Sequence, residues 1–159
     1  MPHEQAFLLQ RVQPAMVGLI DGSLATLAPS FAGALATHKP HYACIAGLAS
    51  AIAAGVSMAY SEGLSDTGEF TGRGHPATRG AITGVGTFLG GILHTLPFLI
   101  PHYHAALVAA VVVVAVEMVG LAWIRWRFFS ADFAKSLAWI MLAAALIVLV
   151  SAALGNAAG

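Results

Sequence analysis

Charged residues are scarce in this 159-residue chain: they make up 9% of it, against about 25% in an ordinary soluble domain. Seven Lys and Arg residues balance seven Asp and Glu residues, so the formal net charge is zero and no basic field exists to hold nucleic acid. The single cysteine, Cys44, excludes a disulfide framework and any zinc or iron–sulfur site built from several cysteines. A soluble domain of this length needs a polar surface, and this chain has too few charges to form one.

Apolar residues are abundant instead, at 58% of the chain. They form five stretches near the length of about 20 residues that a helix needs to cross a bilayer core of about 30 Å. These stretches predict transmembrane helices at residues 15–36, 43–64, 81–100, 105–124 and 133–154. The sequence therefore predicts an all-α integral membrane protein whose residues 1–159 form one transmembrane domain.

The positive charges indicate an orientation. Only Lys39 lies in the first or third predicted loop. The N-terminal segment, the second loop and the fourth loop hold the other six, which are Arg11, Arg73, Arg79, Arg125, Arg127 and Lys135. Because Lys and Arg accumulate on the cytosolic side of membrane proteins, we expect a cytosolic N-terminus and a C-terminus outside. Trp123 and Trp126 fit an interfacial aromatic belt at the cytosolic end of the fourth helix.

Two acidic residues, Asp21 and Glu117, lie well inside predicted helices, with no Lys or Arg at comparable depth. A carboxylate at mid-membrane costs about 2.5–3.5 kcal/mol on insertion scales, so a proton or a bound cation must balance the charge. One interpretation is that these carboxyl groups serve ion or proton movement. The other is that each is simply protonated and hydrogen-bonded between helices. Acidic residues inside membranes are usually functional, which favours the first interpretation.

A stripe of candidate cation ligands follows the second predicted helix. Helix rise places Met58 at about the depth of Asp21, and Glu62 lies one turn beyond Met58 on the same face. Asp66 and Glu69 continue this face if the helix extends that far. Carboxylates attract divalent cations, and a thioether favours softer transition metals, so the stripe predicts a cation path leading to Asp21 and Met58. The alternative is a solvated helix end with a methionine that fills the core.

Histidines are weaker candidates for metal binding. For His94, the sequence favours an interhelical hydrogen bond over a metal contact. His94 and Glu117 are both secondary metal candidates. The two outside loops carry His38, His41, His102 and His104, for which a metal-release patch and no function both remain open. No His-Glu-x-x-His motif, nucleophile–base pair or redox-cofactor motif is visible, so we expect no enzyme.

Several strings of residues carry a family resemblance. They are residues 18–24 (GLIDGSL), 53–58 (AAGVSM), 71–76 (TGRGHP), 93–98 (LHTLPF) and 122–127 (AWIRWR). The first two strings resemble the vacuolar iron transporter family. The last three, together with residues 57–66 (SMAYSEGLSD), resemble the membrane domain of bacterial membrane-bound ferritins more closely still.

The resemblance implies a homodimer of five-helix subunits in a bacterial inner membrane. It also implies a pathway at the two-fold interface, where Asp21 and Met58 of both subunits contact Fe²⁺ or a similar ion. The metal would leave the cytosol in exchange for protons. A two-fold axis would bring two carboxylates and two thioethers to one site.

Some features depart from the vacuolar pattern. Pro14 and Ser50 stand where that family carries acids, and its long cytosolic metal-binding domain shrinks here to residues 66–78. Glu62 and Glu117 are therefore the candidates for proton coupling. About a dozen residues precede the first predicted helix, in place of a ferritin-like domain. A soluble ferritin-like protein is therefore the expected partner if iron is oxidised or stored.

The predicted function is export of Fe²⁺ or Mn²⁺ by a homodimer, with the metal as transported ion and no permanently bound cofactor. Two alternatives remain. A membrane anchor for a soluble iron-storage partner would tolerate Asp21→Asn. A channel for protons or monovalent cations would tolerate Met58→Leu, because a thioether offers little to H⁺ or Na⁺.

Overall fold

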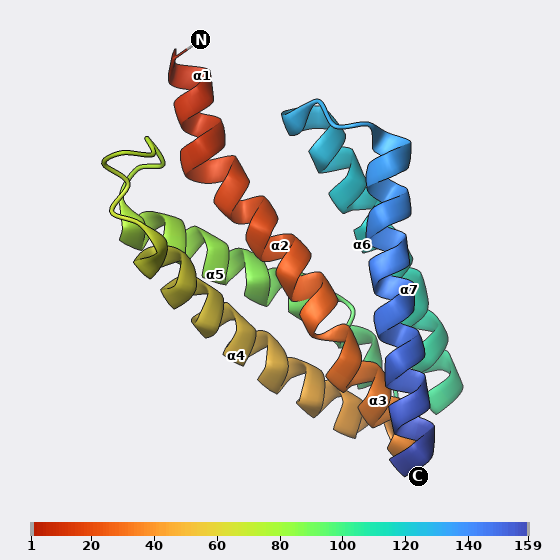
Figure 1. Cartoon of the computed structure of the whole chain (residues 1–159). Coiled ribbons are helices and arrows are strands. Elements are labelled where there is room, and N and C mark those ends of the chain that lie inside the picture. Colours follow the sequence, from red (N-terminus) through yellow and green to blue (C-terminus); the bar gives the residue numbers. More distant parts are fainter. Residues whose placement is uncertain (1, 159) are drawn as a thin grey trace.

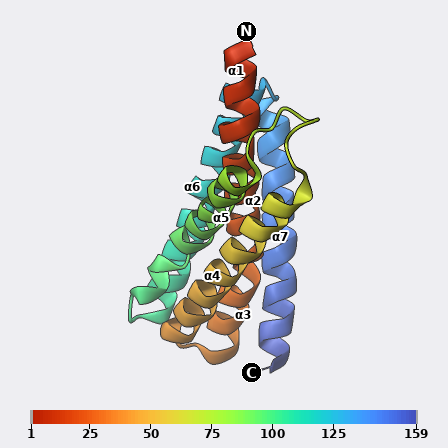
Figure 2. The same cartoon turned by 90° about the vertical axis from the view of Figure 1, so that its left-hand side faces the viewer.

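The computed structural model describes residues 2–158, and over these residues it contains helices and turns but no strands. An N-terminal helical segment, α4, α5, α6 and α7 run alternately in opposite directions. The two chain ends consequently lie at opposite ends of the molecule (Figure 1, Figure 2). The prediction of an all-helical protein is confirmed.

The N-terminal segment consists of four elements that follow one another in a single rod. They are α1 (Pro2–Phe7), the π-helix η1 (Leu8–Val12), α2 (Gln13–Ala25) and α3 (Leu27–Thr37). We expected an uninterrupted helix over 15–36, whereas the structure breaks the α-helix at Thr26. Pro29 removes the N–H that would bond to the carbonyl of Ala25, and the Thr26 hydroxyl donates to the carbonyl of Gly22 at 2.9 Å.

Three further helices are long and uninterrupted: α4 (Pro40–Ser65), α6 (Tyr103–Phe129) and α7 (Phe133–Ala158). Each is a few residues longer than the corresponding predicted span. Left-handed backbone at His38 (φ 52°) ends α3, and the same conformation at Ser130 (φ 51°) ends α6.

The third predicted span, 81–100, differs most from the structure. Here α5 (Pro76–Leu93) begins five residues earlier and ends at Leu93, with His94 as its C-cap, and the short 3₁₀ helix η2 (Leu96–Leu99) follows it. Pro76 at the start of α5 explains the early beginning, because proline favours the first turn of a helix. As a result, Arg79 lies inside α5 and is buried, although the sequence placed it in a loop.

Close approach of α2 to α5 builds the centre of the bundle. Gly22 makes this approach feasible, because a Cβ atom at that position would overlap the backbone of Thr87. At the far end of the bundle, Phe31 of α3 meets Phe98 of η2 edge to face, with ring centroids 5.8 Å apart.

Among residues 2–158, four helical segments are long and apolar enough to cross a membrane: 3–37, 40–65, 103–129 and 133–157. Their outward faces carry large apolar side chains such as Ile45, Val108 and Leu149, each more than 60% exposed. In a soluble protein this apolar surface would face water, so the structure is consistent with an integral membrane protein.

Candidate functional site

Asp21 of α2 and Met58 of α4 line the same open groove, whose volume is about 500 Å³. The other lining residues are Val17, Ile20, Leu24, Ala25 and Ile147. These residues come from α2, α4 and α7. In the ribbon view, α2 passes between α4 and α7 (Figure 1). The structure therefore brings together the two residues that helix rise had placed at the same depth.

The carboxyl group of Asp21 is half-buried, and no Lys, Arg or His lines the groove. Within residues 2–158, no side chain forms an ion pair or hydrogen bond with this carboxyl group. A charge on Asp21 would thus face apolar surroundings alone, which is costly inside a bilayer. A carboxylate oxygen together with a thioether offers a mixed hard and soft donor set for a divalent transition metal.

One chain supplies too few donors to enclose such an ion. The described residues contain no group of three or more His, Cys, Asp or Glu side chains placed to hold a metal. Asp21 and Met58 provide one carboxylate and one thioether, whereas transition metals usually take four to six ligands. A metal ion in this groove would therefore need further ligands from water or from a second protein chain.

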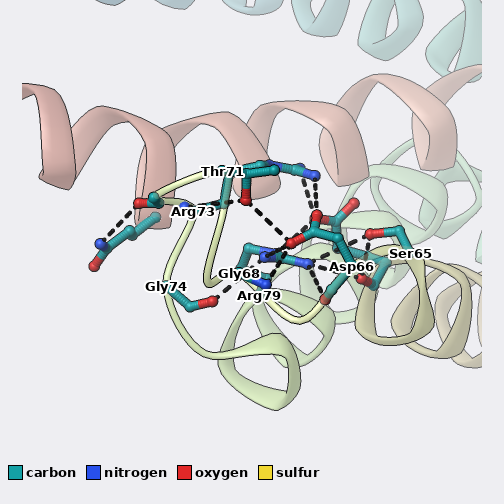
Figure 3. A network of polar contacts seen from close by, with 10 residues as sticks. Ser65, Asp66, Gly68, Thr71, Arg73, Gly74 and Arg79 are labelled. Atoms are coloured by element: carbon teal, nitrogen blue, oxygen red, sulfur yellow. Dashed lines mark hydrogen bonds and ion pairs between the residues drawn. The ribbon is translucent and has the colours of Figure 1, made fainter.

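Asp66 belongs to a separate cluster at the end of α4, together with Arg73 and Arg79 (Figure 3). Glu62 of α4 belongs to the same cluster, since it pairs with both arginines. Glu62 Oε1 accepts hydrogen bonds from Arg73 Nη2 at 2.6 Å and from Arg79 Nε at 3.0 Å. Asp66 accepts one from Nη1 of each arginine, at 3.1 Å in both cases. The two positive charges therefore match the two negative ones, and a cation here would have to displace an arginine.

Arg79 also closes the end of α4. Its side chain is 1% exposed and reaches the backbone carbonyl oxygens of Glu62 at 3.3 Å and Asp66 at 3.2 Å. The carbonyl of Gly74 accepts a further bond at 3.4 Å. Because the last carbonyls of a helix lack partners within the helix, Arg79 fills that role and ties α4 to α5.

The pKa of the Asp66 carboxyl group lies below its usual value. Burial works in the opposite direction, but hydrogen bonds from Thr71, Arg79 and the backbone N–H of Gly68, with the charge of Arg79, outweigh it. Asp66 is consequently ionised at neutral pH and is held in the cluster.

The predicted stripe along α4 does not continue past the helix end. The helix ends at Ser65, and Asp66 has extended backbone with φ −161°. Glu69 lies in the following turn and is exposed. A continuous ligand face would need a helix that extends to these residues. The helix stops before them, and Arg79 donates hydrogen bonds to the carbonyls of Glu62 and Asp66 at its end.

A second polar cluster lies in the core and joins three elements. His94 Nδ1 is 3.0 Å from Glu117 Oε2, and His94 Nε2 is 2.9 Å from the hydroxyl oxygen of Thr26. His94 and Thr26 are fully buried, and the Glu117 side chain is 6% exposed. His94 thus makes the interhelical hydrogen bonds that the sequence favoured, and both of its ring nitrogens are engaged.

The four histidines of the first and third predicted loops contact aromatic rings or are exposed. His38 and His104 each contact the ring of Tyr103, with centroid distances of 4.9 Å and 5.1 Å, while His41 contacts Tyr42 at 4.1 Å. His102 is exposed just before α6. These contacts define no metal patch in the described part of the chain.

Sequence reasoning missed three residues of these clusters: Thr26, Arg73 and Arg79. The arginines had a visible signal, because the segment between the second and third predicted spans pairs acids at its start with bases further on. Thr26 had a weaker one, its position three residues before Pro29, where a helix loses a hydrogen bond. Neither signal identifies the partner, since the partners are distant in sequence.

No protein-family model, curated protein or solved structure is similar enough to this chain to match it.

Proposed function

We propose that this protein moves a divalent transition metal, Fe²⁺ or Mn²⁺, out of the cytosol. One observation carries the proposal: Asp21 and Met58, from different helices, line a single groove in which no basic side chain neutralises the carboxylate. A purely structural carboxyl group inside a membrane would be expected to have a hydrogen-bond partner. Asp21 instead lines the open groove without such a partner among the described residues.

The donor types favour the metal class. Mg²⁺ and Ca²⁺ prefer all-oxygen ligands, whereas a thioether adds affinity for softer ions of the first transition row. Protons and monovalent cations gain little from sulfur. Met58 therefore favours Fe²⁺ or Mn²⁺ transport over a proton or monovalent-cation channel.

The active form is proposed to be a homodimer with the groove at its two-fold axis. A second copy would supply a second Asp21 and a second Met58, completing a site that one chain leaves short of ligands. This arrangement agrees with the resemblance to vacuolar iron transporters, in which the first two helices form the pathway.

Five membrane crossings are part of the proposal, with the α5–η2 unit as the third crossing. Its 18-residue α5 rises about 27 Å, close to the thickness of a bilayer core. α2 and α4 pack closely against α5, and its glycines and threonines lie in these contacts. An odd number of crossings also fits chain ends on opposite sides of the molecule (Figure 1).

Glu62 and Asp66 are not proposed as cation ligands, in contrast to the prediction from sequence. Because Arg73 and Arg79 neutralise them, they serve as a closed ion cluster at the cytosolic end of α4 rather than as free ligands. Proton coupling is assigned to Glu117 in preference to Glu62 for the same reason.

Metal flux into proteoliposomes tests the function. Fe²⁺, Mn²⁺, Zn²⁺ and Mg²⁺ are compared for the wild-type protein, for Asp21→Asn, and for Glu69→Gln as a control acid in the exposed turn. We expect Fe²⁺ or Mn²⁺ flux that disappears in Asp21→Asn and persists in Glu69→Gln. Absence of flux for all four ions from folded, reconstituted protein would overturn the transporter and favour an anchor for an iron-storage partner.

A further inference from the structure

The buried His94–Glu117 pair is hydrogen-bonded to the end of α2, the helix that carries Asp21. The link is the hydroxyl group of Thr26, which directly follows α2. Its oxygen is 2.9 Å from His94 Nε2, 2.9 Å from the carbonyl oxygen of Gly22 and 3.2 Å from that of Gly91. A hydroxyl group has one proton to donate. It can serve either a carbonyl or the imidazole, but not both.

With one proton between His94 and Glu117, every strong contact is satisfied. His94 Nε2–H donates to the Thr26 hydroxyl, which donates its own proton to the Gly22 carbonyl. The remaining proton lies between His94 Nδ1 and Glu117 Oε2, as a neutral pair or as an imidazolium–carboxylate pair. Both forms have the same number of protons and a net charge of zero.

Loss of that proton to water leaves the pair with a net charge of −1. The remaining imidazole proton must then move from one ring nitrogen to the other. If the imidazole proton stays on Nε2, the bare Nδ1 faces a carboxylate oxygen at 3.0 Å with no proton between them. Moving it to Nδ1 restores the bond to Glu117. Nε2 then becomes an acceptor, and only the Thr26 hydroxyl is in position to donate to it.

We propose that the His94–Glu117 pair is a single-proton binding site whose deprotonation turns the Thr26 hydroxyl away from Gly22 and toward His94. The Gly22 carbonyl would then keep only its bond from the Thr26 backbone N–H, which is long at 3.4 Å. The hydrogen bonding at the break between α2 and α3 weakens in consequence. Since Gly22 follows Asp21 directly, loss of the proton changes the hydrogen bonding one residue from the groove.

The surroundings leave this pair isolated. His94 is the one charged or titratable partner of Glu117 in the described structure, and Glu117 Oε1 is buried without a hydrogen-bond partner. The packed elements α3 and η2 carry no charged residue. Charged or titratable groups of the other packed elements are Asp21 in the groove, His41, Tyr42, Cys44 and Tyr60 on α4, Glu62 and Arg79 in their ion cluster, Tyr103, His104, Arg125 and Arg127 near the ends of α6, and Lys135 at the start of α7.

This inference deepens the proposed function, on which its final step rests. Metal entering the groove would bring positive charge near Asp21, and release of the proton would offset part of it. The proton site itself exists whether or not metal moves. Its test therefore uses metal-free protein.

Nitrogen NMR of the histidine rings in lipid nanodiscs tests the inference on the wild-type chain. The other six histidines are exposed, so the signal protected from solvent exchange belongs to His94. Raising the pH is expected to move the ring proton from Nε2 to Nδ1, with a simultaneous change in the backbone amide signals of Gly22 and Thr26. An Nε2–H ring that persists while Glu117 loses its proton, or a pair that does not titrate while the protein stays folded, would overturn the inference.

Matched variants separate this site from a merely structural one. Thr26→Ser retains the hydroxyl and should keep the pH response of the Gly22 amide, whereas Thr26→Val should abolish it. Glu117→Gln should remove the titrating carboxyl band from infrared spectra, and Asp21→Asn should leave that band unchanged. A titrating pair without metal flux would overturn only the transporter, while metal flux without a titrating pair would overturn only this inference.

Discussion

Arg79 of α5 and Glu62 of α4 form an ion pair in which Arg79 Nε lies 3.0 Å from Glu62 Oε1 and the arginine side chain is 1% exposed. Taking an arginine out of water is expensive, and its cost is offset here by two carboxylates and three backbone carbonyl oxygens. The pair consequently holds the first turn of α5 against the end of α4.

Arg79→Gln should destabilise the protein much more than Arg73→Gln. Arg79 is buried and bonded to both carboxylates and the α4 carbonyls, while the Arg73 side chain is 22% exposed. Removing one partner of a buried ion pair costs about 3–5 kcal/mol, and a more exposed one costs less. Reversible unfolding in detergent measures both variants, and equal losses would contradict the placement of Arg79.

The lowered pKa of Asp66 predicts a stability contribution that depends on pH. A carboxyl group with a lower pKa in the folded state stabilises that state above the unfolded pKa of about 3.8, and this stabilisation is lost as the pH falls through the folded value. The difference in melting temperature between the wild type and Asp66→Asn should therefore be constant near neutral pH and shrink below about pH 3.8. A difference that grows on acidification would have the wrong sign.

Met58→Leu should reduce the preference for transition metals and leave the fold intact. Leucine has a similar volume but no sulfur, so Fe²⁺ and Mn²⁺ flux should fall by roughly tenfold relative to Mg²⁺, as a loss of about 1.4 kcal/mol would produce. Met141→Leu on the exposed face of α7 is the matched control. Unchanged ion preference in Met58→Leu would favour the proton or monovalent-cation channel.

Gly22→Ala should separate α2 from α5. The added Cβ would overlap the backbone of Thr87, which cannot swing aside as a side chain can, so we expect a loss of about 1–3 kcal/mol in unfolding free energy. Gly120→Ala provides the contrast, because nothing lies within 4 Å of a Cβ there. That variant should be neutral or gain up to about 1 kcal/mol from helix propensity. Similar effects at both sites would contradict the close contact.

Prediction from sequence worked best where a helix needs only length and apolar composition. The spans expected at 105–124 and 133–154 lie inside α6 and α7, and the structure extends them by a few residues at one or both ends. It worked least well for α5, whose glycines and threonines pack against other helices and lower its hydropathy. Arg79 shows the same limit, since its charge indicated a loop until Glu62 and Asp66 were placed around it.

Helical structure and suitability for a membrane follow from the sequence, because apolar run length and scarce charge are local properties. Asp21, Met58, His94 and Glu117 are likewise recognisable as polar or sulfur-bearing groups inside predicted helices. Which polar groups have partners depends on how the helices pack. Arginines neutralise Glu62 and Asp66, His94 engages Glu117, and Asp21 keeps an open groove, since each of these contacts joins residues that different helices bring together.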